Sequence, residues 1–381
     1  MLLRAAIGVL ALSLGAVALA GTPAVHSVSQ PRAGEGAAPQ SLLPDSPTSS
    51  SSVVHSSRPA FAQTAGAPSF QQQLSPSSAD FARMLREQAE TDRTWRQASE
   101  GFMRMDKITY RSSRRDLDVP AFVFQPLARS SAHRAALVWV HEDIRGHLYE
   151  HYIPYIREAV GRGFIVIAPE YRGSIGYGKS YYDAIDYGGA EVDDVTTAVS
   201  VLRARYGVDP DRIGIVGWSH GGLIALLATF RNPGLFQSVA AIVPVTNLFH
   251  RLALKGVEAQ RRAIDPQNRF GGSPSERPDV YRYRSPLFHV DDLRVPVVLS
   301  LADNDDDVSI DEAMPLADAF RARKPQLADV KVYHNPPGGH LFDRRVSSIT
   351  RLPENTPEQV DSWSRVWKLF DSTLQPEESS R

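Results

Sequence analysis

The 381-residue chain contains no cysteine. This absence excludes disulfide bonds, thiolate metal sites, a cysteine nucleophile and lipid attached to an N-terminal cysteine. An excess of either charge is also missing, because 42 basic and 43 acidic residues leave a formal net charge of −1. We therefore expect no nucleic-acid partner and no electrostatic attraction to an anionic membrane. Any nucleophile must be an oxygen or a nitrogen.

The first residues of the chain follow the three-part pattern of a secretory signal peptide. Arg4 supplies a positive charge, an apolar run continues to Ala20, and Ala18-Leu19-Ala20 forms a small-x-small cleavage site. The pattern predicts a signal peptide at residues 1–20 and a secreted or periplasmic protein without stable membrane association after cleavage. An uncleaved membrane anchor is the alternative, although the run is short for a full span.

Residues 21–78 differ in composition from the rest, being rich in Ser, Pro and Ala, as in SPTSSSSVVHSS at 46–57. Such a segment cannot bury enough apolar area to offset the entropy lost on ordering. It is predicted to be a disordered linker ahead of one domain at 79–381. Residues 79–102 are helix-like, and 105–112 and 119–127 are predicted as two strands joined by a polar turn.

Apolar runs of strand length then alternate with helix-like segments. The predicted strands are 135–140, 164–169, 212–217, 238–244, 295–301 and 329–334, and the predicted helices are 152–163, 190–207, 223–230, 311–324 and 357–374. Nearly continuous apolar strands that alternate with helices indicate an α/β fold with a mostly parallel sheet covered on both faces. Functional residues are then expected just after the carboxyl ends of the strands.

The stretch Gly217-Trp218-Ser219-His220-Gly221 fits the pattern G-x-S-x-G between a predicted strand and a predicted helix. A serine on such a sharp turn projects above the sheet, and glycines two residues to either side avoid clashes. The helix N-terminus favours developing negative charge, and the backbone N–H of His220 can face an oxyanion. We interpret Ser219 as a nucleophile rather than as part of a glycine-rich turn without chemistry. The side chain of His220 is expected to pack or cap rather than to catalyse.

Two later strand ends provide an acid and a histidine. Several aspartates at 303–307 follow one strand, and His340 lies in a glycine-flanked loop after the last strand. The order serine, acid, histidine is the one expected for this arrangement. A calcium loop is not favoured at 303–307, because the run lacks the required glycine and distal glutamate.

The loop His141–Gly146 after the first long strand is expected to supply the second oxyanion donor. Its first two residues begin the zinc motif H-E-x-x-H, but Arg145 stands where that motif requires a histidine. His147 and His151 lie four residues apart without an evident third ligand. We therefore predict no catalytic metal and no cofactor.

Four stretches together resemble the catalytic domain of the prolyl oligopeptidase family, whose members have the α/β-hydrolase fold. They are YRGSIGYGKSYYDA with EVDDV at 171–195, GWSHGG at 217–222, FGGSPSERPDVYRYRSPLFHVDDL at 270–293 and NPPGGHLF at 335–342. The resemblance extends from about residue 105 to residue 375. An insertion from Thr246 to about Arg284 is expected to form a small cap over the site, with a packed surface helix as the alternative. Phe249, Leu252 and Leu254 are available to line its pocket.

The resemblance implies a role for each motif residue. Ser219 is the expected nucleophile and His340 the base, and the family pattern places the acid three residues before a valine. That valine is Val308, so Asp305 is the expected acid. Asp303 and Asp306 are the alternatives.

The backbone N–H of Asp143 is the second oxyanion donor that the resemblance implies. Tyr177, Trp218 and Glu142 are the candidate substrate-binding residues.

The sequence departs from the family pattern in two respects. HEDIRG replaces the usual HGGP and is more similar to a loop of dienelactone hydrolases, and no segment resembles the large β-propeller of many family members. We predict a secreted serine hydrolase that cleaves peptide or acyl-peptide bonds. The alternatives are a carboxylesterase or dienelactone-hydrolase-like enzyme acting on small esters and, from another class, a non-catalytic binding module. The expected partner is a small-molecule or peptide substrate, and a homo-oligomer stays open.

Overall fold

The computed structural model describes residues 76–128, 134–253 and 269–375. The predicted signal peptide, nearly all of the predicted linker and Leu254 lie outside these residues. Among the described helices, none is both long and apolar enough to cross a membrane.

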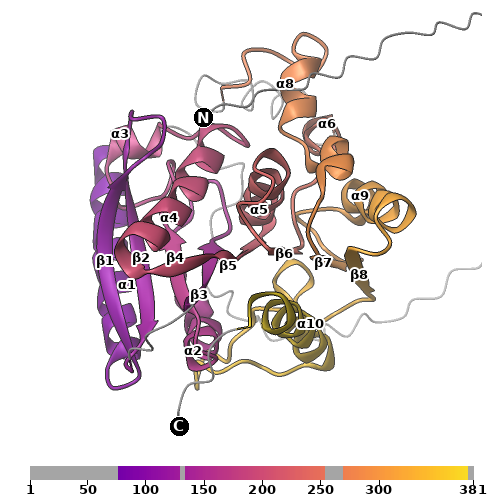
Figure 1. Ribbon diagram of the computed structural model, residues 1–381. Coiled ribbons are helices and arrows are strands. Elements are labelled where there is room, and N and C mark those ends of the chain that lie inside the picture. Colours follow the sequence, from indigo (N-terminus) through magenta and orange to yellow (C-terminus); the bar gives the residue numbers. More distant parts are fainter. Residues whose placement is uncertain (1–75, 129–133, 254–268, 376–381) are drawn as a thin grey trace, which may run out of the picture. The chain divides into compact units, whose positions relative to one another are not determined.

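The centre of the fold is an eight-stranded sheet with the strand order β1-β2-β4-β3-β5-β6-β7-β8 (Figure 1). β1 pairs antiparallel with β2, and β2 pairs antiparallel with β4, whereas all other neighbours are parallel. The strands are β1 Met103–Arg111, β2 Asp118–Pro126, β3 Arg134–Val140, β4 Ile165–Pro169, β5 Val208–Trp218, β6 Ser238–Ile242, β7 Val297–Ala302 and β8 Ala328–Tyr333. This confirms the mostly parallel sheet of the α/β-hydrolase fold.

Helices cover both faces of the sheet. They are α1 Ser78–Ser99, α2 Ile153–Gly161, α3 Lys179–Tyr182, α4 Ala190–Tyr206, α5 Ser219–Arg231, α6 Leu248–Ala253, α8 Pro278–Tyr283, α9 Ile310–Arg323 and α10 Pro357–Leu374. Short 3-10 helices are η2 Glu150–Tyr152, η3 Pro286–Asp292 and η4 Gly339–Leu341. α4, α5 and α9 pack on one face, and α2 and α10 pack on the other (Figure 1).

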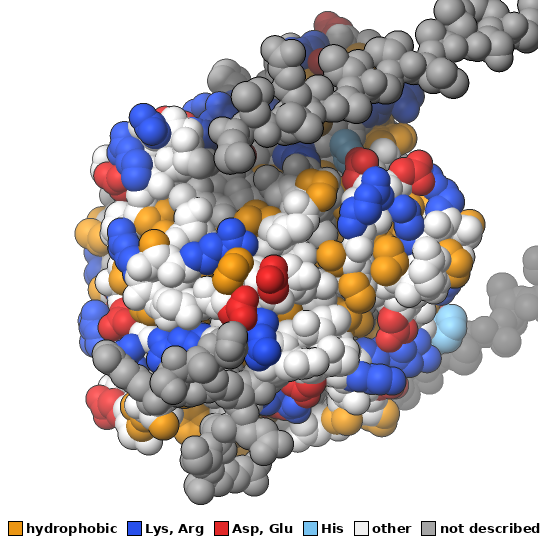
Figure 2. Space-filling view, viewed as in Figure 1, with side chains coloured by type: hydrophobic (Ala, Val, Ile, Leu, Met, Phe, Trp, Pro, Cys, Tyr) orange, Lys and Arg blue, Asp and Glu red, His pale blue; other side chains and the backbone are white. Residues whose placement is uncertain are grey.

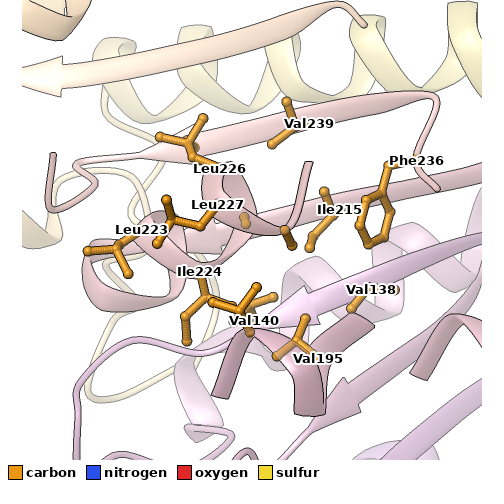
Figure 3. Close-up of a cluster of buried hydrophobic side chains, with 14 of the residues drawn as sticks. Val138, Val140, Val195, Ile215, Leu223, Ile224, Leu226, Leu227, Phe236 and Val239 are labelled. Carbon is orange, nitrogen blue, oxygen red and sulfur yellow. The ribbon is translucent and has the colours of Figure 1, made fainter. Parts of the chain in front are cut away.

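Each face of the sheet therefore has its own apolar core. In the core beneath α4 and α5, aliphatic side chains from the two helices meet those of β3, β5 and β6 (Figure 3). The labelled side chains are Val138, Val140, Val195, Ile215, Leu223, Ile224, Leu226, Leu227, Phe236 and Val239. Because both faces are covered, β4, β6 and β7 are buried along their whole length, as the apolar sequence runs predict.

The helix before the sheet begins where its sequence provides a cap. Ser77 accepts a hydrogen bond from the backbone N–H of Asp80, and the Asp80 carboxylate accepts one from the backbone N–H of Ser77. This capping box satisfies two of the N–H groups that a helix start leaves unpaired. From the other end of the helix, the indole of Trp95 donates to the carbonyl of Leu148 at 3.0 Å, so α1 is tied to the segment after β3.

The sequence-based boundaries differ from the structure in few places. β5 begins at Val208, ahead of the predicted start at residue 212. In the predicted cap at 246–284, residues 254–268 lie outside the described chain. Leu252 is buried in the core rather than exposed to a pocket, and Phe249 packs edge-on against Phe288. The prediction that Leu252 lines a substrate pocket is therefore wrong, since its side chain completes the core instead.

Candidate active site

Ser219 lies at the sharp turn between β5 and α5. Its φ of 51° is in the left-handed region, which is strained for a residue with a side chain. The backbone N–H of Val245 donates to the Ser219 carbonyl at 3.1 Å and holds the turn in place. The serine therefore has the strained strand-to-helix geometry that its motif predicts.

Two glycines allow this turn because other backbone comes too close for any side chain. A Cβ on Gly217 would lie 2.2 Å from the carbonyl oxygen of Gly221. A Cβ on Gly221 would lie 2.3 Å from the carbonyl oxygen of His141. The first turn of α5 thus packs directly on the end of β3, where Val140 is paired in register with Gly217. The nucleophile turn and the loop after β3 are neighbours.

The peptides on the two sides of Asp143 are each held by a neighbouring side chain. Nδ1 of His141 donates to the Glu142 carbonyl at 2.7 Å, and a carbonyl can only accept, so this nitrogen carries the proton. The Tyr171 hydroxyl donates to the carbonyl of Asp143 at 2.7 Å. Asp143 has a φ of 67°, and no described residue accepts a hydrogen bond from its backbone N–H. The N–H predicted as the second oxyanion donor is held by its neighbours and available.

His141 keeps this role over a wide pH range. Burial lowers the pKa of its imidazole to about 3, so the ring is neutral at pH values well above 3. Burial also raises the pKa of the Asp143 carboxyl, and the charge of Glu142 adds to this shift. The Asp143 carboxyl accepts a hydrogen bond from the Tyr149 hydroxyl at 2.7 Å.

Among the predicted acids, Asp305 contacts the predicted base. Its Oδ2 lies 2.7 Å from Nδ1 of His340. Its Oδ1 accepts the backbone N–H groups of Asp307 at 2.9 Å and Val308 at 2.8 Å, which fixes the carboxylate. Asp303 instead bonds His334 and the backbone N–H of Asn335, so this alternative acid is engaged elsewhere.

The pKa of His340 reflects this surrounding. Burial lowers the pKa of the imidazole, but the hydrogen bond and the charge of Asp305 outweigh burial and raise it above its ordinary value. The positive charge of His340 in turn acts on Asp143, opposing the rise of that carboxyl's pKa. The charge of His340 is therefore coupled to the Asp143 carboxyl as well as to Asp305.

A buried polar network joins the histidine loop to the other two loops of the site. The Arg344 guanidinium pairs with Glu142 of the β3 loop and, at 3.0 Å, with Asp343, and it donates to the His340 carbonyl at 2.8 Å. The Asp343 carboxylate accepts the indole N–H of Trp218 at 2.6 Å. The network thus connects the loop of His340 with Trp218, which precedes the predicted nucleophile, and with Glu142, which precedes the predicted second oxyanion donor.

The sequence did not reveal this network, because nothing in the stretch LFDRR marks Asp343 and Arg344 as buried. Burial raises the pKa of Asp343, whereas for Glu142 the charges of Arg344 and His151 outweigh burial and hold the pKa of the carboxyl well below its usual range. The Glu142 carboxylate is therefore ionised and paired.

The structure places two of the three predicted substrate-binding side chains away from any surface. Trp218 has no exposed area and packs among Trp139, Tyr152 and Trp363. Glu142 is 4% exposed and paired. Both predictions are corrected, since a buried and saturated side chain is a support rather than a substrate contact. Tyr177 is partly buried, and its substrate contact stays a prediction.

The His220 side chain packs, as predicted. Its Nε2 lies 3.1 Å from Oε1 of Glu191, and its ring lies between those of Tyr171 and Tyr187. Its backbone N–H belongs to the first turn of α5, where helix N–H groups have no intrahelical acceptor. The backbone of His220, rather than its imidazole, is therefore the part suited to an oxyanion.

Comparison with known proteins places the chain among serine peptidases. The YtmA protein of Bacillus subtilis (strain 168), named an uncharacterized peptidase, is 29% identical over 166 residues, 44% of this chain and 62% of that protein. The acylamino-acid-releasing enzyme of Arabidopsis thaliana is 28% identical over 191 residues, 48% of this chain and 24% of that enzyme. The chain spans less than two thirds of the length of these relatives.

Solved structures support the same fold. A puromycin-hydrolyzing peptidase of Mycobacterium tuberculosis has a TM-score of 0.59 at 23% identity, covering 72% of this chain and 40% of that one. The acylaminoacyl peptidase of Pyrococcus horikoshii has a TM-score of 0.58 at 18% identity, covering 74% of this chain and 44% of that one. A sequence model described as the prolyl oligopeptidase family matches residues 152–354, more than half of the chain and including the nucleophile turn, the acid loop and the histidine loop. The chain belongs to the prolyl oligopeptidase family.

Proposed function

We propose that this protein is a serine peptidase that cleaves peptide or acyl-peptide bonds through Ser219, His340 and Asp305. The observation that carries the proposal is the 2.7 Å contact between Asp305 and His340. The buried network of Arg344 and Asp343 supports it, because it ties the histidine loop to the residue preceding the nucleophile.

In the proposed reaction, Nε2 of His340 takes the proton of Ser219 as its oxygen attacks the substrate carbonyl. The Asp305 carboxylate holds the proton on Nδ1 and stabilises the imidazolium that forms. The backbone N–H groups of His220 and Asp143 bind the oxyanion, each lowering the barrier by about 3 kcal/mol. His340 then protonates the leaving amine. Water, activated by the same base, hydrolyses the acyl-enzyme.

A peptide substrate is proposed because the family and its named relatives are peptidases or acylamino-acid-releasing enzymes. The formal net charge of −1 gives the protein no overall preference for a charged substrate. Acidic and basic side chains lie interspersed on the face shown in Figure 2. Selectivity must then come from side chains near Ser219.

An esterase acting on small esters is the second candidate. The observation that favours it is the loop His141–Gly146, in which the side chain of Asp143 and the paired Glu142 replace the small residues of the HGGP pattern. Bulkier residues beside the oxyanion donor leave less room for an extended chain. We also propose export from the cytoplasm, on the signal-like pattern at residues 1–20.

The substrate class is tested with paired chromogenic substrates. Hydrolysis of aminoacyl and N-acylaminoacyl p-nitroanilides is compared with that of short p-nitrophenyl esters, for the wild-type protein and for Ser219→Ala. Nitroanilide turnover that the substitution abolishes is expected. Turnover of esters alone makes the protein an esterase, and activity that survives in Ser219→Ala refutes the proposed nucleophile.

A further inference from the structure

A second carboxylate lies beside the catalytic imidazole, on the side opposite Asp305. Oδ2 of Asp307 is 3.7 Å from Nε2 of His340, the nitrogen that must exchange protons with Ser219. The Asp307 side chain is 44% exposed, whereas that of Asp305 is 2% exposed. The two nitrogens of the ring therefore have different carboxylates, one buried and bonded and one at the surface.

The Asp307 carboxylate is held in place from two directions. Arg251 of α6 donates from Nη1 to the Asp307 carbonyl at 3.0 Å and from Nη2 to its carboxylate oxygens at 3.3 and 3.2 Å. The backbone N–H of Asp307 donates to Asp305. Only 10% of the Arg251 side chain is exposed, and its Nη1 is also 3.6 Å from Glu312. A well-anchored guanidinium thus fixes the position of Asp307 against the base.

The distance determines how Asp307 can act on the base. A separation of 3.7 Å is too long for a hydrogen bond, so the lone pair of Nε2 stays available for the Ser219 proton. A negative charge at this distance still favours the protonated ring. Arg251 and solvent screen part of that charge, so the effect is smaller than that of Asp305.

We propose that Asp307, positioned by Arg251, is a second carboxylate of the catalytic histidine that acts through its charge on the imidazolium formed during acyl transfer. The inference rests on the proposed function, since it requires His340 to be the base of Ser219. In this proposal Asp307 acts on the protonation of His340 and does not itself react.

The charged groups that face His340 come from three loops. Asp305 and Asp307 of the acid loop favour the imidazolium, Arg344 of its own loop opposes it, and the Asp143 carboxyl of the β3 loop interacts favourably with it. Removing the Asp307 charge lowers the pKa of His340. Because the neutral ring is the active base, the acid limb of the reaction then moves to lower pH.

The test measures the rate of labelling by a fluorophosphonate probe as a function of pH, which needs no natural substrate. In Asp307→Asn the midpoint of the acid limb is expected to fall by about half a pH unit. Asp306→Asn is the matched control, because Asp306 is the exposed neighbour and the substitution removes the same charge. The midpoint of Asp306→Asn is expected to stay at the wild-type value. Asp307→Glu keeps the negative charge, so its midpoint is expected to lie close to the wild-type value.

An unchanged midpoint in Asp307→Asn, or an equal shift in Asp306→Asn, overturns the inference. If Asp307→Asn folds poorly, as measured by its thermal transition, Asp307→Ser removes the same charge with a smaller side chain and decides the question equally. Failure of the proposed function is distinguishable, because it appears as labelling that persists in Ser219→Ala. If only this inference fails, labelling still depends on Ser219, but its pH profile in Asp307→Asn is the same as in the wild type.

Discussion

Nδ1 of His340 lies 2.7 Å from Oδ2 of Asp305, across 35 residues of sequence. This contact selects one acid from the several aspartates that follow β7. In the proposed mechanism it also fixes the imidazole so that Nε2 is the nitrogen left for the proposed nucleophile, Ser219.

Replacing Asp305 by asparagine should leave the fold intact and remove most activity. An amide can turn its NH₂ towards Nδ1 and favour the wrong tautomer of His340, so kcat is expected to fall about 10⁴-fold. Kinetics measure the effect, with whichever of the p-nitroanilides or p-nitrophenyl esters the wild-type protein hydrolyses. Asp303→Asn and Asp306→Asn serve as controls and should each change kcat by less than about tenfold. A loss in either control as large as in Asp305→Asn means that the acid is misassigned.

The nucleophile turn should not tolerate a methyl group. In Gly217→Ala the new Cβ would lie 2.2 Å from a backbone oxygen, which is expected to destabilise the fold by about 2–3 kcal/mol and displace Ser219. Gly161→Ala at the end of α2 is the matched control, because its Cβ would meet only a Phe102 ring atom at 3.7 Å. Urea unfolding compares the two, and equal stabilities contradict the close packing of this turn.

The buried cation of the histidine loop should be essential to stability. Arg344→Met leaves the Glu142 and Asp343 carboxylates buried without their guanidinium, and the expected loss is about 3–5 kcal/mol in the free energy of unfolding. Arg345→Met changes the next residue, whose partner Glu354 is at the surface, and should cost less than about 1 kcal/mol. Comparable losses for both variants argue against the network.

A buried acid after β4 should make stability depend on pH. Burial raises the pKa of Glu170 to about 8, well above its ordinary value of about 4.3 in an unfolded chain. The folded state therefore holds this proton more tightly, so the carboxyl lowers stability progressively as pH rises from about 4.3 to about 8. Its Oε1 accepts the backbone N–H of Leu148, and its Oε2 has no described partner.

Glu170→Gln keeps the acceptor and removes the titrating group. The substitution is expected to stabilise the protein more at pH 8 than at pH 5, by at least about 1 kcal/mol. Chemical unfolding at both pH values measures the difference. Glu158→Gln, at a surface site paired with Arg162, is the control and should show little pH dependence. A gain that is equal at both pH values shows that the carboxyl is not the cause.

Much of this architecture was predictable because local sequence patterns determine it. Short apolar runs such as Leu137–Val140, separated by helix-like segments, are typical of buried strands between covered faces. The nucleophile turn was recognisable from its two glycines and its place between a strand and a helix. The chain order of Ser219 and His340 then followed the fold.

What escaped prediction depends on long-range pairing. The sequence does not show to which face of the sheet the Trp218 side chain points, because a sheet covered on both faces can bury an apolar side chain on either side. The pair of Glu142 and Arg344 joins residues 202 positions apart, and neither has a local signature of burial. The choice of Asp305 among neighbouring aspartates likewise depends on which carboxylate its own loop turns inward.

The identity of the nucleophile is tested most directly by locating the covalent adduct of a fluorophosphonate. The wild-type protein is labelled and digested, and the modified peptide is sequenced by mass spectrometry, with Ser219→Ala treated in parallel. The account predicts a single phosphonate on Ser219 and none in the variant. An adduct on another residue, or equal labelling of Ser219→Ala, would contradict it.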